Sequence, residues 1–298
     1  MKTLVSDISL GKRNFLLDKL ADYAQLVKVN LTLVVVFSAA MGYVIASKGD
    51  FVLINFLILV FGGFLTTSSG NALNQVLEKD FDIHMTRTAN RPVASGRMKS
   101  SEAVMFAGIA CLIGISLLAS FNPLTGLLGM LSLIIYSFIY TPLKRYSTLA
   151  VPVGAVPGAL PVMIGFTAFE NGISMLALSL FVIQFLWQFP HFWAIGFNSY
   201  GEYQKAGYKL LPEVHGSIDR NLGLTSFFYS LLIFPVIVFI YLRLDGSLIG
   251  FVLMLLISVI YSLLSFDFHL KFNRPSALKL MFYSFLFLPA TLFIYWLS

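Results

Sequence analysis

The sequence has few charged residues and almost no cysteine. Only 11% of its 298 residues are Asp, Glu, Lys or Arg, against about 25% in an average soluble domain. The single cysteine, Cys111, excludes a disulfide framework and a cysteine metal site within the chain. Apolar residues make up 58% of the sequence and the mean hydropathy is +0.84, which excludes an ordinary soluble fold. These values predict a multi-pass membrane protein.

Long apolar runs divide the chain into nine predicted helices, each long enough to cross a hydrocarbon core of about 30 Å. They cover residues 28–47, 51–70, 102–120, 124–141, 149–168, 173–196, 224–242, 247–265 and 279–297. We therefore expect an all-α membrane domain over residues 28–298, with a central cavity. It follows an amphipathic segment over 1–27, in which apolar residues recur at helical spacing.

The basic residues predict the orientation of this domain. If the N-terminus and every second connection share one side, that side has 18 of the 20 Lys and Arg, and the other has only Lys48 and Arg243. By the positive-inside rule the N-terminus and the long connections 71–101 and 197–223 are cytoplasmic, and the C-terminus is outside. We expect the cavity to open to the cytoplasmic side. The positive-inside rule accounts for the basic residues that give the pI of about 9.3. Nucleic acid is therefore not an expected partner.

The first long connection begins with a candidate metal site. Asn74, Glu78 and Asp82 are four residues apart, so they share one helix face and can converge on one ligand. Asp80 lies about 200° around the helix and is expected to point elsewhere. Two carboxylates and an amide oxygen suit Mg²⁺, whose coordination is commonly completed by substrate phosphates. The alternative is a solvated loop whose charges simply end the helix.

Four cationic side chains are candidates for binding a phosphate held by that acidic face. Arg87 and Arg91 follow it four residues apart, and Lys144 and Arg145 follow Pro142. We expect Pro142 to end the fourth helix at the cytoplasmic interface. Positive-inside anchoring would also explain the Lys-Arg pair, so both explanations stay open.

The sixth predicted helix combines aromatic and polar groups at membrane depth. Trp187, His191 and Trp193 lie within seven residues, and Asn198 and Glu202 follow one turn apart where the chain emerges. A lone histidine in a bundle is commonly a packing residue, although polar groups buried in lipid favour a function. Asn198 and Glu202 could form a second, poorer cation site, or belong to a plain loop.

These motifs resemble the intramembrane prenyltransferase superfamily, which includes the ubiquinone- and menaquinone-biosynthesis enzymes. Its motif Asn-x3-Asp-x3-Asp, followed by Arg-x3-Arg-Pro, corresponds to Asn74, Glu78, Asp82, Arg87, Arg91 and Pro92. A further stretch of the family corresponds to Tyr140–Arg145, and two stretches typical of its heme-modifying branch correspond to Trp187–Trp193 and Glu202–Pro212. Glu78 and Glu202 stand where the family has Asp.

The resemblance implies transfer of a farnesyl group from farnesyl diphosphate to heme b, giving heme O. It implies Mg²⁺ bound by Asn74, Glu78 and Asp82, and catalytic roles for these residues and for Lys144 and Arg145. It implies substrate binding by Arg87, Arg91, Tyr140, Trp187, His191, Trp193, Asn198 and Glu202. It also implies a bacterial cell (inner) membrane location and a downstream heme A synthase as partner. Prenylation of a quinone precursor, transport of an anionic solute and a non-catalytic heme chaperone remain alternatives.

Overall fold

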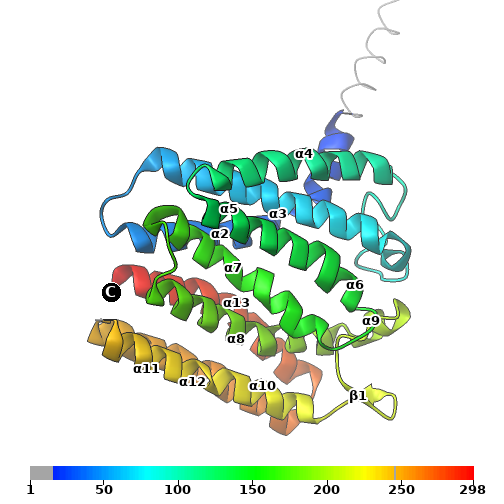
Figure 1. Cartoon of the computed structure of the whole chain (residues 1–298). Helices are drawn as coiled ribbons and strands as arrows, with labels where there is room; N and C mark the ends of the chain where they lie inside the picture. The colour runs from blue at the N-terminus through cyan, green and yellow to red at the C-terminus, as the bar shows by residue number, and fades with distance from the viewer. Residues whose placement is uncertain (1–15, 245) are drawn as a thin grey trace, which may run out of the picture.

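The computed structural model describes residues 16–244 and 246–298, and this part of the chain is almost entirely helical. Its helices run side by side as one bundle (Figure 1), and nine spans are long and apolar enough to cross a membrane, as predicted. The spans are α2 (Val29–Ser47), α3 (Leu53–Asp82), α4 (Ser100–Ala119), α5 with η1 and α6 (Pro123–Leu143), α7 (Ala150–Glu170), α8 (Met175–Asn198), α10 with α11 (Asn221–Arg243), α12 (Leu248–Lys271) and α13 (Arg274–Leu297).

The last helix of the bundle returns to the first. α13 packs against both α8 and α2, while α2 packs on α7 and α3 packs on α4. Figure 1 shows the turns after α3 and the short helix α9 (Tyr200–Lys205) at one end of the bundle, with the C-terminus at the opposite end. A two-stranded hairpin, β1 (Glu213–Val214) and β2 (Ser217–Ile218), lies at the same end as α9. The polar connections are therefore gathered together.

Three helices are at least five residues longer than the apolar runs predict. α3 continues from the predicted end at residue 70 to Asp82, so its polar second half extends one continuous helix. α12 continues to Lys271, and α13 begins five residues early, at Arg274. The early start of α13 has a local cause, because Asn273 and Ser276 form a capping box that satisfies free backbone N–H groups. Hydropathy locates the apolar part of such helices but not their capped polar ends.

The fourth span ends at Leu143, one residue past Pro142, so Lys144 and Arg145 lie just past its end, as predicted. The helix widens into the π-helix η1 (Ile135–Tyr140) and continues through α6 (Thr141–Leu143). A wider turn tolerates the missing N–H of proline. The Thr141 hydroxyl donates to the Tyr136 carbonyl at 2.8 Å and so satisfies an acceptor within this turn. The π-helix also changes which side chains of this span face α3.

The prolines inside α7, Pro157 and Pro161, do not break the helix, and its glycines allow close packing instead. A Cβ atom added to Gly165 would lie 2.0 Å from the carbonyl oxygen of Ala39 on α2. A Cβ atom added to Gly42 would lie 2.3 Å from a carbonyl oxygen of α7. The two backbones are therefore in direct contact, as small residues permit in membrane bundles.

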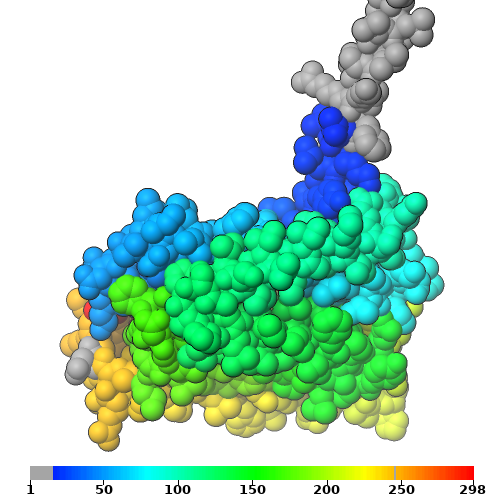
Figure 2. All heavy atoms as spheres, turned by 45° about the horizontal axis from the view of Figure 1, so that its top comes forward, coloured from blue at the N-terminus to red at the C-terminus, as the bar shows by residue number. Residues whose placement is uncertain are grey.

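The predicted amphipathic segment is described only from residue 16, and residues 1–15 lie outside the described part. Residues 16–26 are helical and stand out from the bundle beside α4 (Figure 2). Arg97 donates to Asp22 at 2.8 Å, and Lys19 lies 3.1 Å from Glu102 on α4. These contacts tie the N-terminal helix to the end of the bundle that holds the polar connections.

We predict that Gly165→Ala destabilises the protein by about 1–3 kcal/mol, because the new methyl group would overlap the α2 backbone. Gly108→Ala is the matched control, since a Cβ atom there meets nothing within 4 Å. Thermal unfolding of both variants in detergent measures the difference. A melting temperature of Gly165→Ala equal to that of the unsubstituted chain would contradict the direct backbone contact.

Candidate functional site

The polar half of α3 has three buried side chains on successive turns. Asn74, Glu78 and Asp82 are 1%, 3% and 0% exposed, respectively, and lie on the buried face that their spacing predicts. Asp80 is exposed, also as predicted. Groups of this polarity are buried only with partners, because an unpaired buried charge is strongly unfavourable.

Each of the three side chains contacts a different cationic residue. The pairs are Lys28 with Asn74, Lys144 with Glu78, and Arg91 with Asp82. The Lys28 ammonium donates to the amide oxygen of Asn74 at 2.6 Å. Arg91 Nη1 lies 2.7 Å from Asp82 Oδ2 and 3.8 Å from Glu78 Oε2, so one guanidinium bridges both carboxylates. We call these six residues the charged cluster.

The charged cluster has a net formal charge of +1 when its three cations and two carboxylates are all ionised. Burial lowers the pKa of Lys28 to about 7, so an anion bound here favours its charged form. Buried cations are stabilised by anions, and guanidinium and ammonium groups match phosphate oxygens. The cluster therefore suits a phosphate-bearing ligand.

The oxygens of Asn74, Glu78 and Asp82 fit a hard divalent cation. Two carboxylates and an amide oxygen form an all-oxygen donor set, which suits Mg²⁺ better than softer metals. Among the described residues there is no group of three or more His, Cys, Asp or Glu that could hold a metal. An ion at this donor set would thus need water or ligand oxygens to complete its coordination, as Mg²⁺ commonly does.

Lys28 was not among the predicted site residues. It lies where the N-terminal helix and α2 meet, with φ 51° and ψ 57°, a left-handed conformation that lysine rarely adopts. Asn71 donates to the Val27 carbonyl at 3.1 Å, and Gln75 donates to the Gln25 carbonyl at 2.8 Å. α3 thus supplies the acidic residues. Its side chains also hold the left-handed break between the N-terminal helix and α2, which orients Lys28. In the sequence, a lysine before an apolar run is indistinguishable from an anchoring residue.

The segment after α9 covers the charged cluster. Tyr208 is 6% exposed, and its ring stacks on that of Phe81 with centroids 6.1 Å apart. The backbone N–H of Lys209 donates to the Lys144 carbonyl at 2.7 Å. The Lys144 ammonium lies 4.9 Å from the ring centroid of Tyr140 and 5.4 Å from that of Tyr208. Two aromatic faces therefore stabilise positive charge here.

The structure separates the other two predicted phosphate contacts from the cluster. Arg145 donates to the carbonyl of Leu77, and its guanidinium lies 3.7 Å from the ring centroid of Phe81. Arg87 is exposed to solvent. Arg145 thus packs on the side of α3, whereas Lys144 contacts the Glu78 carboxylate.

Asn198 and Glu202 are engaged separately. Glu202 accepts a hydrogen bond from the backbone N–H of Thr86 and forms an ion pair with Lys205 at 2.8 Å. The Lys205 ammonium, followed by the Thr86 amide, lowers the pKa of Glu202 to about 2. Asn198 donates to the carbonyl of Ala194 at 2.7 Å. Glu202 therefore links α9 to the turns after α3.

The aromatic and histidine side chains of α8 face other partners. His191 is 8% exposed, its Nδ1 lies 2.7 Å from Ser284 Oγ on α13, and its ring stacks on Trp187 with centroids 4.8 Å apart. Trp193 packs edge-on against Phe189. Trp187 and His191 therefore lie at the α8–α13 contact, whereas Trp193 also packs against Tyr229 of α10.

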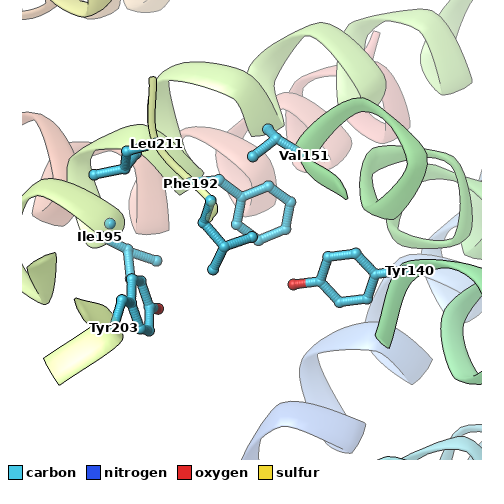
Figure 3. Close-up of a pocket in the computed structure, with 8 residues that line it drawn as sticks. Tyr140, Val151, Phe192, Ile195, Tyr203 and Leu211 are labelled. Carbon is cyan, nitrogen blue, oxygen red and sulfur yellow. The ribbon is translucent and has the colours of Figure 1, made fainter. Parts of the chain in front are cut away.

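An apolar pocket adjoins the charged cluster. It is lined by side chains that include Val151, Phe192 and Leu211. Figure 3 shows the Tyr140 hydroxyl pointing into this space opposite Phe192, with Tyr203 below. Tyr140 borders the pocket and also flanks Lys144. One ligand with an apolar part and an anionic head can therefore reach both the pocket and the charged cluster.

The fold and the site define a multi-pass membrane protein with an oxygen-rich, cation-lined cluster beside an apolar pocket. A comparison with known families finds a match to the UbiA prenyltransferase family over residues 35–287. The chain belongs to this family of enzymes.

Curated relatives are similar over most of the chain. A protoheme IX farnesyltransferase of Cytophaga hutchinsonii is 39% identical over 268 residues, covering 90% of this chain and 93% of the relative. The mitochondrial protoheme IX farnesyltransferase of Homo sapiens is 35% identical over 276 residues, covering 91% of this chain and 60% of the human protein.

Solved structures share the fold at low sequence identity. A digeranylgeranylglyceryl phosphate synthase superposes with a TM-score of 0.80 at 18% identity, covering 94% of this chain and 98% of the other. A UbiA homologue from Archaeoglobus fulgidus, solved with DMAPP and Mg²⁺, has a TM-score of 0.65 at 15% identity, covering 92% and 98%. The nine-span architecture is therefore that of the family.

We predict that Glu202→Ala accelerates hydrogen exchange of the Thr86 amide about ten-fold, because that amide loses its acceptor. Glu170→Ala, an exposed acidic residue at the end of α7, is the control. Exchange followed by mass spectrometry with peptide resolution measures the effect.

The lowered pKa of Glu202 adds a pH dependence to this link. The stabilisation by the carboxylate is fully present above its ordinary pKa and is lost progressively as the pH falls from there to about 2. Protection of Thr86, corrected for the intrinsic exchange rate, should therefore be the same at pH 7 and pH 5. A loss of protection at pH 5 would show that the carboxylate is not held as described.

Proposed function

We propose that the chain transfers the farnesyl group of farnesyl diphosphate to a vinyl group of heme b, giving heme O. The observation that carries this proposal is the charged cluster beside an apolar pocket, which fits a prenyl diphosphate. Curated relatives named protoheme IX farnesyltransferase, similar over most of the chain, support heme b as the acceptor.

Asn74, Glu78 and Asp82 would hold Mg²⁺, whose positive charge would neutralise the diphosphate. The donor set described above supports this assignment, and so does the Archaeoglobus fulgidus neighbour solved with DMAPP and Mg²⁺. Glu78 in place of the usual Asp is one methylene longer and remains an oxygen ligand.

In the reaction that we propose, Lys28, Arg91 and Lys144 bind the diphosphate oxygens. They stabilise the negative charge that grows on the leaving group as its C–O bond breaks and diphosphate departs with the bonding electrons. The faces of Tyr140 and Tyr208, which flank the Lys144 ammonium, stabilise the allylic cation that is left.

The vinyl group of the acceptor then supplies the electrons for the new carbon–carbon bond. Water adds to the remaining cationic carbon and loses a proton, which leaves a hydroxyl group on the product. The apolar pocket excludes bulk water until the carbon–carbon bond has formed.

The remaining predicted residues have supporting roles in this proposal. Arg87 and Arg145, which lie outside the charged cluster, add positive charge around the diphosphate, Trp187, His191 and Trp193 contact the porphyrin, and Asn198 and Glu202 position substrate. Residues 28–298 form one domain, and its site opens to the cytoplasm with the N-terminus on the same side and the C-terminus outside. The protein lies in a bacterial cell (inner) membrane, and a heme A synthase takes the product.

We predict that the purified protein converts heme b to heme O when farnesyl diphosphate and Mg²⁺ are present. Mass spectrometry of the extracted heme measures the product, and EDTA should abolish it. Asp82→Asn should lower the rate at least about a hundred-fold, because it removes a buried anionic ligand. Prenylation of an aromatic acid in place of heme b, or uptake of an anionic solute without any covalent product, would contradict the proposal.

We further predict that Lys28→Gln lowers kcat/KM for the prenyl donor about ten-fold, since it removes a cation that binds the diphosphate. Lys79→Gln is the matched control, because Lys79 lies on the same turn of α3 as Glu78 but is exposed. Equal kinetics for the two variants would remove Lys28 from the site.

A further inference from the structure

A buried hydroxyl without a partner lies over the charged cluster. Tyr208 is 6% exposed, and its hydroxyl makes no hydrogen bond to any part of the chain that the structure describes. Leaving a buried hydroxyl unpaired costs free energy, so such groups are rare and call for an explanation. One explanation is a bound ligand that supplies the missing hydrogen-bond partner.

The backbone around Tyr208 fixes its position. The N–H of Tyr208 donates to the Tyr203 carbonyl at 2.9 Å, and the next N–H donates to the Lys144 carbonyl. Gly207, with φ +71°, makes the turn that brings the tyrosine back toward α3. The ring is then packed against Phe81. Two backbone hydrogen bonds, the turn at Gly207 and the Phe81 ring thus hold Tyr208 over the cluster.

The surroundings determine what kind of atom can pair with this hydroxyl. Burial, and next the charges of Glu78 and Asp82, raise the pKa of Tyr208, so the hydroxyl keeps its proton and can donate. Within the chain the neighbouring acceptor is Glu78, whose carboxylate is already paired with Lys144. A phosphate oxygen bound among these cations offers the hydroxyl a second anionic acceptor.

The same segment also borders the apolar pocket. Tyr203, Leu210 and Leu211 line that pocket (Figure 3), and Tyr208 lies between them in the chain and contacts the charged cluster. A ligand with its apolar part in the pocket would have its anionic head near the Tyr208 hydroxyl.

We propose that the Tyr208 hydroxyl donates a hydrogen bond to a phosphate oxygen of the bound prenyl diphosphate. This role rests on the proposed function and adds a neutral donor to its three cations. As the C–O bond breaks, charge accumulates on the diphosphate oxygens, and a donor already held in place stabilises it without reorganisation. Tyr208 occupies an unspecified position of the Glu202–Pro212 stretch, so the sequence motif does not assign it.

The test is binding of inorganic diphosphate, measured by calorimetry in the presence of Mg²⁺, together with thermal unfolding of the unliganded protein. Tyr208→Phe keeps the ring and removes the hydroxyl. It should weaken diphosphate binding about ten-fold. It should leave the melting temperature unchanged or raise it, because a buried unpaired hydroxyl is removed. Tyr146→Phe is the control at the same end of the bundle, where the tyrosine is 73% exposed, and should change neither quantity.

The two measurements separate a binding role from a structural one. Unchanged affinity in Tyr208→Phe would overturn the assignment of Tyr208 while the proposed function stands. A fall in both affinity and melting temperature would also overturn it, because the tyrosine would then support the fold. Failure of the unsubstituted chain to bind Mg²⁺ and diphosphate would overturn both this inference and the proposed function.

Discussion

The burial of two carboxylates at the polar end of a membrane helix is the constraint on which the rest of the site depends. Glu78 and Asp82 are almost fully enclosed, and in an apolar bundle such groups require cations next to them. Arg91 reaches them because the chain turns back directly after α3, and Lys144 reaches them from the next but one span. The fold thus brings together residues from several elements at one point of α3.

Each element that supplies a cation or an aromatic face departs locally from regular helix. Lys28 lies at a left-handed break, and Tyr140 ends a π-helix. The segment with Tyr208 turns at a glycine with positive φ. Such departures raise the local free energy, and they persist where surrounding contacts determine them. Here those contacts come largely from α3, whose Asn71 and Gln75 hold the first break.

The sequence predicts the spans and the acidic face because both depend on local periodicity. Nine apolar runs and the four-residue spacing of Asn74, Glu78 and Asp82 are visible without tertiary contacts. Lys28 and Tyr208 are not predictable in this way, since their places depend on hydrogen bonds to distant segments. The end of the fourth span beside Pro142 is also a local signal, whereas the π-helix that precedes it is not visible in the sequence.

The break before α2 has a consequence for how this protein is made. In the growing chain, the carbonyl groups of Gln25 and Val27 have only local donors, the Lys28 amide and the Thr32 hydroxyl, until the second span arrives with Gln75 and Asn71. The contacts that hold Lys28 in its orientation are therefore complete only after the first two spans have paired, and biogenesis of the site includes the formation of that hairpin of helices.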